Sequence, residues 1–423
     1  MDQSVKRTWQ KANSILLACV LFNLSIGGIF AWSVFRTRLS LPIDDGGWGW
    51  TGSQAGLPYT VAIVMWSLGV LVGGRIQDRI GPRMVVTAGG IMTALGLMLS
   101  GIIGNSPIGI ILSYGVLTGV GIGFGYGCVI PPALKWFHPS KKGLISGLVV
   151  GAFGIAAVYF APLANILFDA FTISQTFIIL GVMVLIISTP MALLVKNPPE
   201  GYIPPEPASG VKTKAAAAAV SELSSREMVR TKRFYLMALM FTFAASVGLM
   251  VIGNMTRIAN IQVGITDTAF LAGLVSFLAI TNFIGRIVGG FMSDKIGRIN
   301  ALYVVFGVQA ANMFAFAYFQ SLPLLILGII AVGFCYGTLM SVFPSLTADQ
   351  YGLKNYGSNY GIVYLFWGLA GTFAPIIADY FFEINGDFRT TYIICGVTMV
   401  AMLFVNYLLK REIAMLNATN ASS

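Results

Sequence analysis

Twelve apolar runs, each about 20 residues long, constrain the fold of this 423-residue sequence more than any other feature. An α-helix of about 20 residues crosses the roughly 30 Å hydrocarbon core of a bilayer, and backbone amides in lipid must be satisfied internally. The alternating pattern of a membrane barrel is absent. The sequence therefore predicts an all-α membrane protein with twelve transmembrane helices. The runs centre on residues 12–35, 52–72, 84–104, 107–132, 143–168, 174–195, 234–254, 266–290, 300–319, 323–347, 357–382 and 388–410.

The distribution of cationic residues predicts the orientation of these helices. If both termini and every second loop lie on one side of the membrane, that side carries 21 of the 26 Lys and Arg residues. Of the other five, four fall on the other side and one within the membrane: Arg36, Arg38, Arg257, Arg389 and, in the membrane, Arg286. Cationic loops stay cytoplasmic. We expect a multi-pass protein of the inner (plasma) membrane with both termini cytoplasmic, whose net charge of +10 reflects topology and contact with the lipid bilayer rather than nucleic acid.

A polar stretch divides the chain into two sets of six helices. We expect an N-terminal six-helix bundle at 1–195, a cytoplasmic linker at 196–233 and a C-terminal six-helix bundle at 234–423. The linker begins with NPPEGYIPPEP, which is typical of an extended proline-rich segment. Its second part can form a short surface helix capped near Ser221. The first apolar run follows basic residues but is too long for a signal peptide, so we expect it to be retained.

An internal repeat supports this division. GGRIQDRIGPR at 73–83 returns as GGFMSDKIGR at 289–298, and Asp78 lies 216 residues before Asp294, as Gly81 does before Gly297. A weaker echo pairs FGYG at 124–127 with FCYG at 334–337. Two related six-helix halves predict a protein that rocks about a central site.

The two repeated loops resemble the signature loops of the major facilitator superfamily. The resemblance implies two pseudo-symmetric six-helix bundles. Because the loop pattern occurs twice, we expect the loops to act in conformational gating and not in substrate binding. An aspartate favours the positive end of a helix dipole, and adjacent cations can latch it to a neighbouring helix in one conformation. The alternative is a tight cationic turn that only sets topology. The gating candidates are Asp78, Arg79, Arg83, Asp294, Lys295 and Arg298.

A narrower resemblance comes from GGIFAWSVF at 27–35, GIGFGYG at 121–127, GFCYGTLMSVFPS at 333–345 and NYGIVYLFWG at 359–368. These segments are similar to the oxalate/formate antiporter branch and its bacterial monocarboxylate transporter relatives. The resemblance implies a secondary active transporter of lactate, pyruvate or a similar monocarboxylate, working by alternating access with proton symport. The alternatives are an oxalate/formate-type anion exchanger and a facilitator-family porter for a different small solute, such as a sugar or a drug.

Arg286 lies inside the apolar run TNFIGRIVGG, where its neighbours avoid charge. It precedes Asp294, at the cytoplasmic end of the run, by eight residues, which places it about 12 Å into the membrane. Such a residue normally faces a wet cavity or a partner. No acidic residue lies at a comparable depth in any predicted helix, so the missing anion is predicted to be the substrate.

A carboxylate suits this position because a guanidinium binds it through two parallel charge-assisted hydrogen bonds. Asn282, one turn earlier on the same face, can donate and accept beside it. In eukaryotic monocarboxylate transporters an aspartate tends to hold this place, so the asparagine removes the most familiar proton carrier. In the alternative interpretation, Arg286 only braces closely packed helices by bonding backbone carbonyls.

Aromatic residues at similar depth are the other candidates for substrate binding. Tyr126 stands in a glycine-rich segment about 13 Å from the membrane edge, and Tyr336 is its echo in the second half. The resemblance implies that these two, with Tyr364 and Phe30, enclose the anion. Ordinary aromatic packing is the alternative for all four, and Trp66 and Trp32 are expected to be packing or interface residues.

One departure from the family pattern bears on the substrate. Oxalate transporters of this branch carry a second membrane cation, a lysine, where alignment on NYG places Trp367. A single cation suits a single carboxylate, because a dianion would bring an unneutralised charge into a low-dielectric cavity. We therefore expect a monocarboxylate such as lactate, pyruvate or formate. Asp379 is expected to be solvated at the external face rather than to carry the proton.

The sequence offers no sign of an enzyme. The four cysteines lie in apolar segments without metal-ligand spacing, and the sole histidine, His138, lies in a basic loop. No nucleophile or acid–base pair lies in the membrane. We expect no cofactor and no metal, and a monomer whose partners are the monocarboxylate anion and the bilayer, with a proton as the open question.

Overall fold

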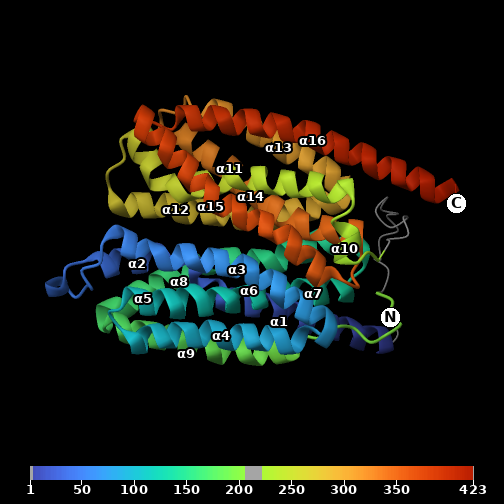
Figure 1. Cartoon of the computed structure of the whole chain (residues 1–423), viewed down its shortest axis with the longest axis horizontal. Coiled ribbons are helices and arrows are strands. Elements are labelled where there is room, and N and C mark those ends of the chain that lie inside the picture. Colours follow the sequence, from blue (N-terminus) through green and yellow to red (C-terminus); the bar gives the residue numbers. More distant parts are fainter. Residues whose placement is uncertain (1–2, 205–221, 423) are drawn as a thin grey trace. The chain divides into compact units, whose positions relative to one another are not determined.

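The computed structural model describes residues 3–204 and 222–422, and within them every regular element is helical (Figure 1). Twelve of its helical segments are long and apolar enough to cross a membrane. The predicted all-α fold with twelve spans is confirmed. The elements are α1 (Gln3–Ile26), η1 (Gly27–Ala31), α2 (Trp32–Ser40), η2 (Ile43–Asp45), α3 (Gly52–Ile80), α4 (Pro82–Ile103), α5 (Pro107–Ile110), η3 (Ile111–Thr118), α6 (Gly119–Cys128), α7 (Ile130–Trp136), η4 (Pro139–Lys141), α8 (Lys142–Ala170), α9 (Ile173–Leu194), α10 (Ser225–Met228), α11 (Lys232–Val263), α12 (Thr268–Ile296), α13 (Arg298–Phe316), α14 (Leu322–Tyr351), α15 (Tyr356–Asn385) and α16 (Arg389–Ser422).

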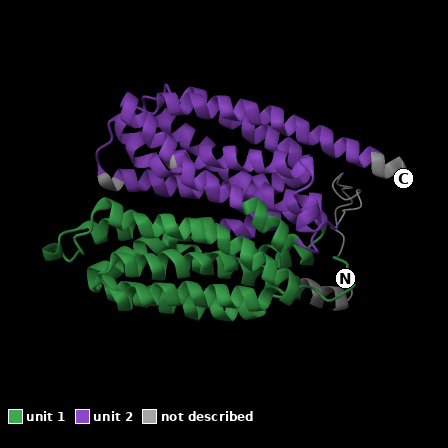
Figure 2. Cartoon of the chain, viewed as in Figure 1, with its two compact units in different colours: residues 1–138, 152–206, 356–364 green, residues 139–151, 207–355, 365–423 purple. Residues whose placement is uncertain are grey.

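The chain forms two compact units, coloured separately in Figure 2. Unit 1 comprises residues 1–138, 152–206 and 356–364, and unit 2 comprises residues 139–151, 207–355 and 365–423. Two helices, α8 and α15, therefore contribute to both units. The beginning of α8 packs with the second half of the sequence, and the beginning of α15 packs with the first half.

Two of the spans are interrupted in ways that hydropathy alone does not predict. The first consists of α1 and α2 with a 3₁₀ segment at Gly27–Ala31 between them. The fourth contains a π-helical stretch at Ile111–Thr118 and a break after Cys128. The break immediately precedes Pro131 and Pro132, which carry no backbone N–H and cannot continue the helical hydrogen-bond ladder.

Local sequence signals explain where several helices begin. Thr51 and Thr172 each form a capping box with a glutamine three residues later, at the starts of α3 and α9. Ser224 forms one with Glu227 at the start of α10, the short helix of the linker. The expected cap near Ser221 lies outside the described residues, and the described cap is Ser224.

Both signature loops contain a glycine with a left-handed backbone. Gly81 has φ 87° and Gly297 has φ 90°, a region that residues with a side chain rarely adopt. The next helix starts at once in each case, at Pro82 and at Arg298. The glycines therefore let α3 run into α4, and α12 into α13, with almost no connecting loop.

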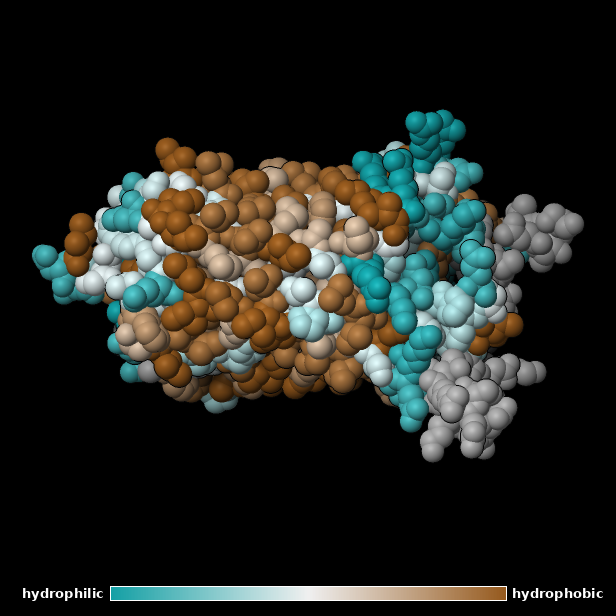
Figure 3. Space-filling model, turned by 90° about the horizontal axis from the view of Figure 1, so that it is seen from below, coloured by the Kyte–Doolittle hydropathy of each residue, from teal (hydrophilic) through white to brown (hydrophobic). Residues whose placement is uncertain are grey.

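One face of α12 packs against a neighbouring helix, and another face carries exposed apolar side chains. Gly285 lies against the Phe334 carbonyl and Gly289 against Thr338, so α12 and α14 pack closely. Ile284 and Val288, one position away, are each 46% exposed. Hydrophobic side chains likewise cover the middle of the face drawn in Figure 3, with hydrophilic ones gathered towards the ends of the helices. Such a surface suits contact with lipid.

Candidate functional site

Arg286 is buried in α12 and is held by two uncharged acceptors. Only 2% of the residue is exposed. Its Nε donates to Oδ1 of Asn282, one turn earlier on the same helix, at 3.0 Å. Its Nη1 donates to the carbonyl oxygen of Val150 on α8, at 2.5 Å. The structure thus brings together the predicted pair of Arg286 and Asn282, and adds a backbone oxygen from a second helix.

No carboxylate neutralises this guanidinium within the part of the chain that the structure describes. None of the ion pairs there includes Arg286. Its Nη2 makes no hydrogen bond to any described residue, while Nε and Nη1 make one each. A buried cation without a charged partner is costly, and dipoles compensate it only in part. The arrangement leaves a buried positive charge that, among the described residues, is held only by neutral acceptors.

Glycines on α8 allow its backbone to reach Arg286. Gly143, Gly147 and Gly151 recur every four residues and so lie on one face of the helix. A Cβ atom added at Gly147 would overlap the carbonyl oxygen of Arg286, and one at Gly151 would lie 3.2 Å from the ring of Phe283. We call this close contact between 143–151 of α8 and 283–294 of α12 the α8–α12 seam.

Three of the predicted aromatic residues form one cluster in unit 1. The ring of Tyr126, 1% exposed, lies 5.2 Å from that of Trp66 and 5.4 Å from that of Tyr364. Phe30 lies 6.0 Å from Trp66 and 5.6 Å from Phe153. The cluster therefore unites Phe30, Tyr126 and Tyr364 around Trp66 and Phe153.

Tyr336, the fourth predicted aromatic residue, lies in unit 2 with Arg286. Its hydroxyl accepts a hydrogen bond from Nε1 of Trp367 at 2.9 Å. A Cβ atom at Gly248 of α11 would overlap the Tyr336 ring, so the ring is packed against that backbone. Trp367, the residue at the aligned lysine position, is itself 1% exposed.

The first signature loop holds the start of a helix from the other half of the sequence. Asp78, near the end of α3, accepts hydrogen bonds from the backbone N–H groups of Gly357 at 3.0 Å and Ser358 at 2.7 Å. Both N–H groups lie in the first turn of α15, where they have no partner within the helix and the helix dipole is positive. No ion pair of the described residues includes Arg79 or Arg83.

The second signature loop repeats this arrangement on α8 and adds charges. Asp294 accepts from the N–H groups of Gly143 and Leu144, both at 2.8 Å. Arg298 pairs with Asp294 at 2.6 Å and with Asp349 at 3.0 Å, and Asp349 also pairs with Lys142 at 2.8 Å. Lys295 instead lies over the ring of Phe291, 4.4 Å from its centre.

Ion pairs also lie near the helix ends opposite the signature loops. Arg38 of α2 pairs with Asp169 of α8 in unit 1, and Arg257 of α11 pairs with Asp379 of α15 at 2.5 Å in unit 2. Arg257 also lies 4.3 Å from the centre of the Phe382 ring. Asp379 is half-exposed, so it keeps contact with solvent while it holds this arginine.

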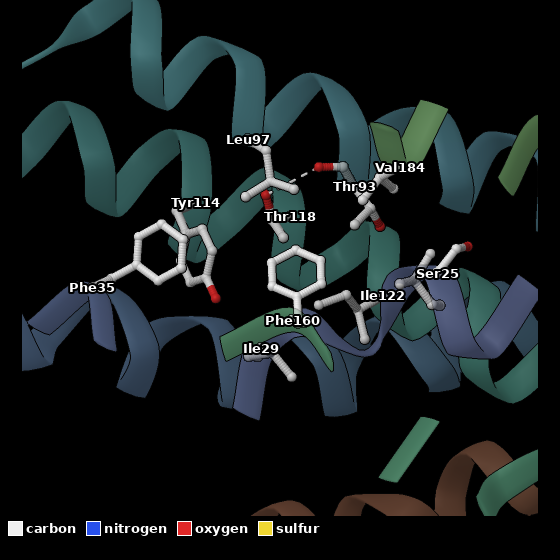
Figure 4. A pocket seen from close by; sticks show the side chains of 12 residues that line it. Ser25, Ile29, Phe35, Thr93, Leu97, Tyr114, Thr118, Ile122, Phe160 and Val184 are labelled. Atoms are coloured by element: carbon white, nitrogen blue, oxygen red, sulfur yellow. Dashed lines mark hydrogen bonds between the residues drawn. The ribbon is translucent and has the colours of Figure 1, made fainter. Parts of the chain in front are cut away.

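A small pocket inside unit 1 contains none of the predicted site residues. Figure 4 shows it between Thr93, Leu97, Thr118 and Phe160, and it has room for about one water molecule. It is too small for an organic acid. Within the described residues, no group of three or more His, Cys, Asp or Glu side chains is placed to hold a metal ion.

Sequence reasoning missed three contributors to these groups. The Val150 carbonyl has no side-chain signal, although the glycine spacing on α8 marks a close backbone approach. Phe153 follows in the same helix among many other phenylalanines, and no pattern distinguishes it. Trp66, assigned to packing, does pack, but against predicted site residues.

The sequence matches the family model described as Major Facilitator Superfamily over residues 14–322 and 310–422. An uncharacterised MFS-type transporter of Escherichia coli (strain K12), YhjX, is 30% identical over 355 residues, covering 84% of each chain. The oxalate:formate antiporter of Oxalobacter formigenes is 25% identical over 403 residues, covering 94% of this chain and 91% of the relative. Monocarboxylate transporter 12 of Rattus norvegicus is 25% identical over 370 residues, 82% of this chain and 76% of the relative.

The fold agrees with these sequence matches. The crystal structure of the transporter FucP in its outward conformation superposes with a TM-score of 0.69 at 14% identity, covering 93% of this chain and 98% of that one. The fold and the matches define a multi-pass membrane transporter rather than an enzyme. The chain belongs to the major facilitator superfamily.

Proposed function

We propose that this protein is a secondary active transporter of small monocarboxylates, such as lactate or pyruvate, that works by alternating access. The observation that carries the proposal is Arg286, a cation 2% exposed that bonds only neutral acceptors among the described residues. A carboxylate supplies the charge that this group lacks and fits its planar fork. Relatives named as an oxalate:formate antiporter and as a monocarboxylate transporter support the substrate class.

The other candidates have separate roles in this proposal. Asn282 orients the guanidinium through Nε, and Phe30, Tyr126, Tyr336 and Tyr364 enclose the organic part of the acid. Asp78 and Asp294 gate the carrier because each holds the start of a helix from the other half of the sequence. Arg298 supports Asp294 directly, whereas Arg79, Arg83 and Lys295 act by charge at the cytoplasmic membrane surface.

A monocarboxylate fits better than oxalate because of the residue at position 367. Trp367 brings a large aromatic ring and one N–H donor, which Tyr336 already accepts. A second carboxylate would find no second cation there. Oxalate–formate exchange by the purified protein would contradict this assignment and favour the anion exchanger.

We assign the coupling to a proton that crosses with the anion, so that the loaded step moves no net charge. The carrier then acts as a monomer in the inner (plasma) membrane, with both termini cytoplasmic. Asp379 is not assigned the proton, since it holds Arg257 at the outer end of α15.

Uptake of labelled lactate into proteoliposomes tests the function. An inward proton gradient should accelerate uptake if a proton crosses with the anion, while stimulation only by acid preloaded inside would indicate exchange. Pyruvate, formate, oxalate, a sugar and a cationic drug serve as competitors. A protein inhibited by the sugar or the drug but not by any monocarboxylate would contradict the proposed substrate class.

Arg286→Lys tests the site. Lysine keeps the charge but loses the planar fork and the bond that Nε gives Asn282, so uptake should fall at least about tenfold. Arg389→Lys is the matched control, because Arg389 is exposed and its contact with Asp387 is long, at 3.8 Å. Near-normal uptake by the Arg286→Lys protein would mean that the substrate binds elsewhere.

A further inference from the structure

The guanidinium of Arg286 has two edges that can hold a carboxylate through two hydrogen bonds, and each already has one nitrogen engaged. On the Nε–Nη2 edge, Nε bonds Asn282. On the Nη1–Nη2 edge, Nη1 bonds the Val150 carbonyl. An anion that forms two hydrogen bonds with either edge must therefore compete with Asn282 for Nε or with the Val150 carbonyl for Nη1.

The two competitors differ in what they are attached to. Asn282 lies four residues before Arg286 on the same helix, so it moves with the arginine. Val150 belongs to α8, and its carbonyl can accept from Arg286 as well as from its own helix because the oxygen has two lone pairs. Only the bond to Val150 joins two helices, and only its loss changes how α8 and α12 are held.

This bond is the innermost of three attachments along the α8–α12 seam. At the cytoplasmic end, Asp294 accepts from the N–H groups of Gly143 and Leu144. In the middle, Gly147 rests on the backbone carbonyl of Arg286. One turn further, Arg286 itself holds Val150. The predicted substrate residue and the predicted gating aspartate are thus two ends of one contact between the same two helices.

We propose that the substrate carboxylate replaces the Val150 carbonyl on Arg286, and that this exchange loosens the α8–α12 seam towards its gating end at Asp294. Gly147 is then a positioning residue, because the close approach it permits sets how strongly the carbonyl competes with the substrate. The inference rests on the proposed function. It follows the rule that a ligand shifts a conformational equilibrium only through contacts that differ between the two conformations.

The internal repeat provides a second contact of the same kind, between α3 and α15, in which no arginine takes part. In unit 1, Asp78 holds the start of α15, and a Cβ atom at Gly361 would lie 3.0 Å from the Val70 carbonyl and 2.7 Å from Cα of Leu71. Val70 precedes Asp78 by eight residues, as Arg286 precedes Asp294. Gly361 is thus the counterpart of Gly147, and a valine occupies the place of the arginine.

The experiment compares Gly147→Ala with Gly361→Ala in purified protein reconstituted in nanodiscs, with L-lactate, pyruvate and formate as probes. Gly147→Ala should push α8 away from Arg286, weaken the competing carbonyl and lower the dissociation constant for the acid by about tenfold, while turnover falls. Gly361→Ala should slow turnover with the dissociation constant unchanged. Equal dissociation constants in both variants, or weaker binding by Gly147→Ala, would overturn the proposal.

A distance measurement serves if Gly147→Ala does not fold. Spin labels at Lys141→Cys, directly before α8, and at Ile296→Cys, the last residue of α12, report the separation of the two helices in protein that retains Gly147. The acid should lengthen this distance, and a distance that stays constant while the acid binds overturns the inference alone. Failure of the wild-type protein to bind any of the three acids overturns the proposed function, and the inference with it.

Discussion

Asn282 fixes which donors of Arg286 remain available. Its Oδ1 occupies Nε from one turn away on the same helix, a geometry that persists whatever the neighbouring helices do. An amide does this without charge, so the site stays cationic. In the proposed site, the residue at position 282 would therefore control whether the arginine keeps a net positive charge for the substrate.

Asn282→Asp should make substrate binding depend on pH. An aspartate would place a carboxylate on Nε, neutralise the guanidinium and weaken lactate binding at pH 8 by about tenfold or more. Binding should recover at pH 5.5 as the new carboxylate takes up a proton. The measurement is the lactate dissociation constant at the two pH values.

Asn282→Ala is the matched control for this substitution. It removes the same acceptor without adding a charge, so the pH dependence of its lactate binding should match that of the wild type. An aspartate variant whose affinity is the same at both pH values would show that position 282 does not control the charge of the site.

For individual residues, the sequence predicts which side chains belong to the candidate site better than it predicts the groups that they contact. The apolar neighbours of Arg286 and the spacing to Asp294 locate a buried cation, and the four-residue spacing locates its partner Asn282. The hydrogen bond from Arg286 to the Val150 carbonyl could not be predicted, because every residue has a backbone carbonyl and nothing in the sequence distinguishes this one. Phe153 could not be singled out either, because only the packing of α8 brings it to Tyr126 and Phe30.

Among the helices, α3 and α15 meet through an aspartate and two backbone N–H groups. The Asp78 carboxylate satisfies Gly357 and Ser358, and a Cβ atom at Gly74 would overlap the Gly357 carbonyl. The glycines permit the close approach, and the carboxylate fixes it. The aspartate therefore acts as a helix cap supplied by a distant part of the sequence.

Asp78→Asn should weaken this contact by roughly 1–2 kcal/mol, because an amide retains one acceptor and turns a donor towards the second N–H. Uptake should fall with it if the loop gates. The measurements are lactate uptake and the denaturation midpoint. Asp267→Asn is the control, since Asp267 caps α12 from an exposed position through one N–H, that of Phe270. Equal effects of the two substitutions would contradict a special role for Asp78.

The short helix α10 should respond to acid. The Ser224 hydroxyl and N–H both donate to Glu227, and these bonds lower the pKa of that carboxyl. A lowered folded-state pKa means that the stabilisation is present above the unfolded pKa of about 4.3 and is lost as pH falls through the folded value. Hydrogen-exchange protection at 227–229 should therefore drop below about pH 4. Glu227→Gln should remove this pH dependence, and protection that persists at pH 3 in the wild type would contradict the cap.

For the whole molecule, hydropathy and the repeat predict the fold because they are properties of long segments. The twelve spans follow from long apolar runs, which local irregularities do not disguise, and the family follows from the repeated signature loops. The interruptions at Gly27–Ala31 and near Pro131 could not be located in the same way, because they depend on short-range geometry within an unbroken apolar run.

The orientation of the whole chain can be tested with single cysteines. Asp44→Cys should react with a membrane-impermeant maleimide added outside intact cells, and Glu200→Cys only after the membrane is opened. The four native cysteines are at most 9% exposed, so the wild-type protein provides the unreactive background. The reverse pattern of labelling would place the termini outside.

The two signature-loop aspartates link the copies of the repeat to each other. Each belongs to one copy of the repeat and completes a helix that begins in the other copy: Asp78 completes α15, and Asp294 completes α8. In each case the backbone N–H groups at the helix start receive their carboxylate acceptor from the other copy. A single copy of the repeat would therefore meet the same requirement only by pairing with a second molecule.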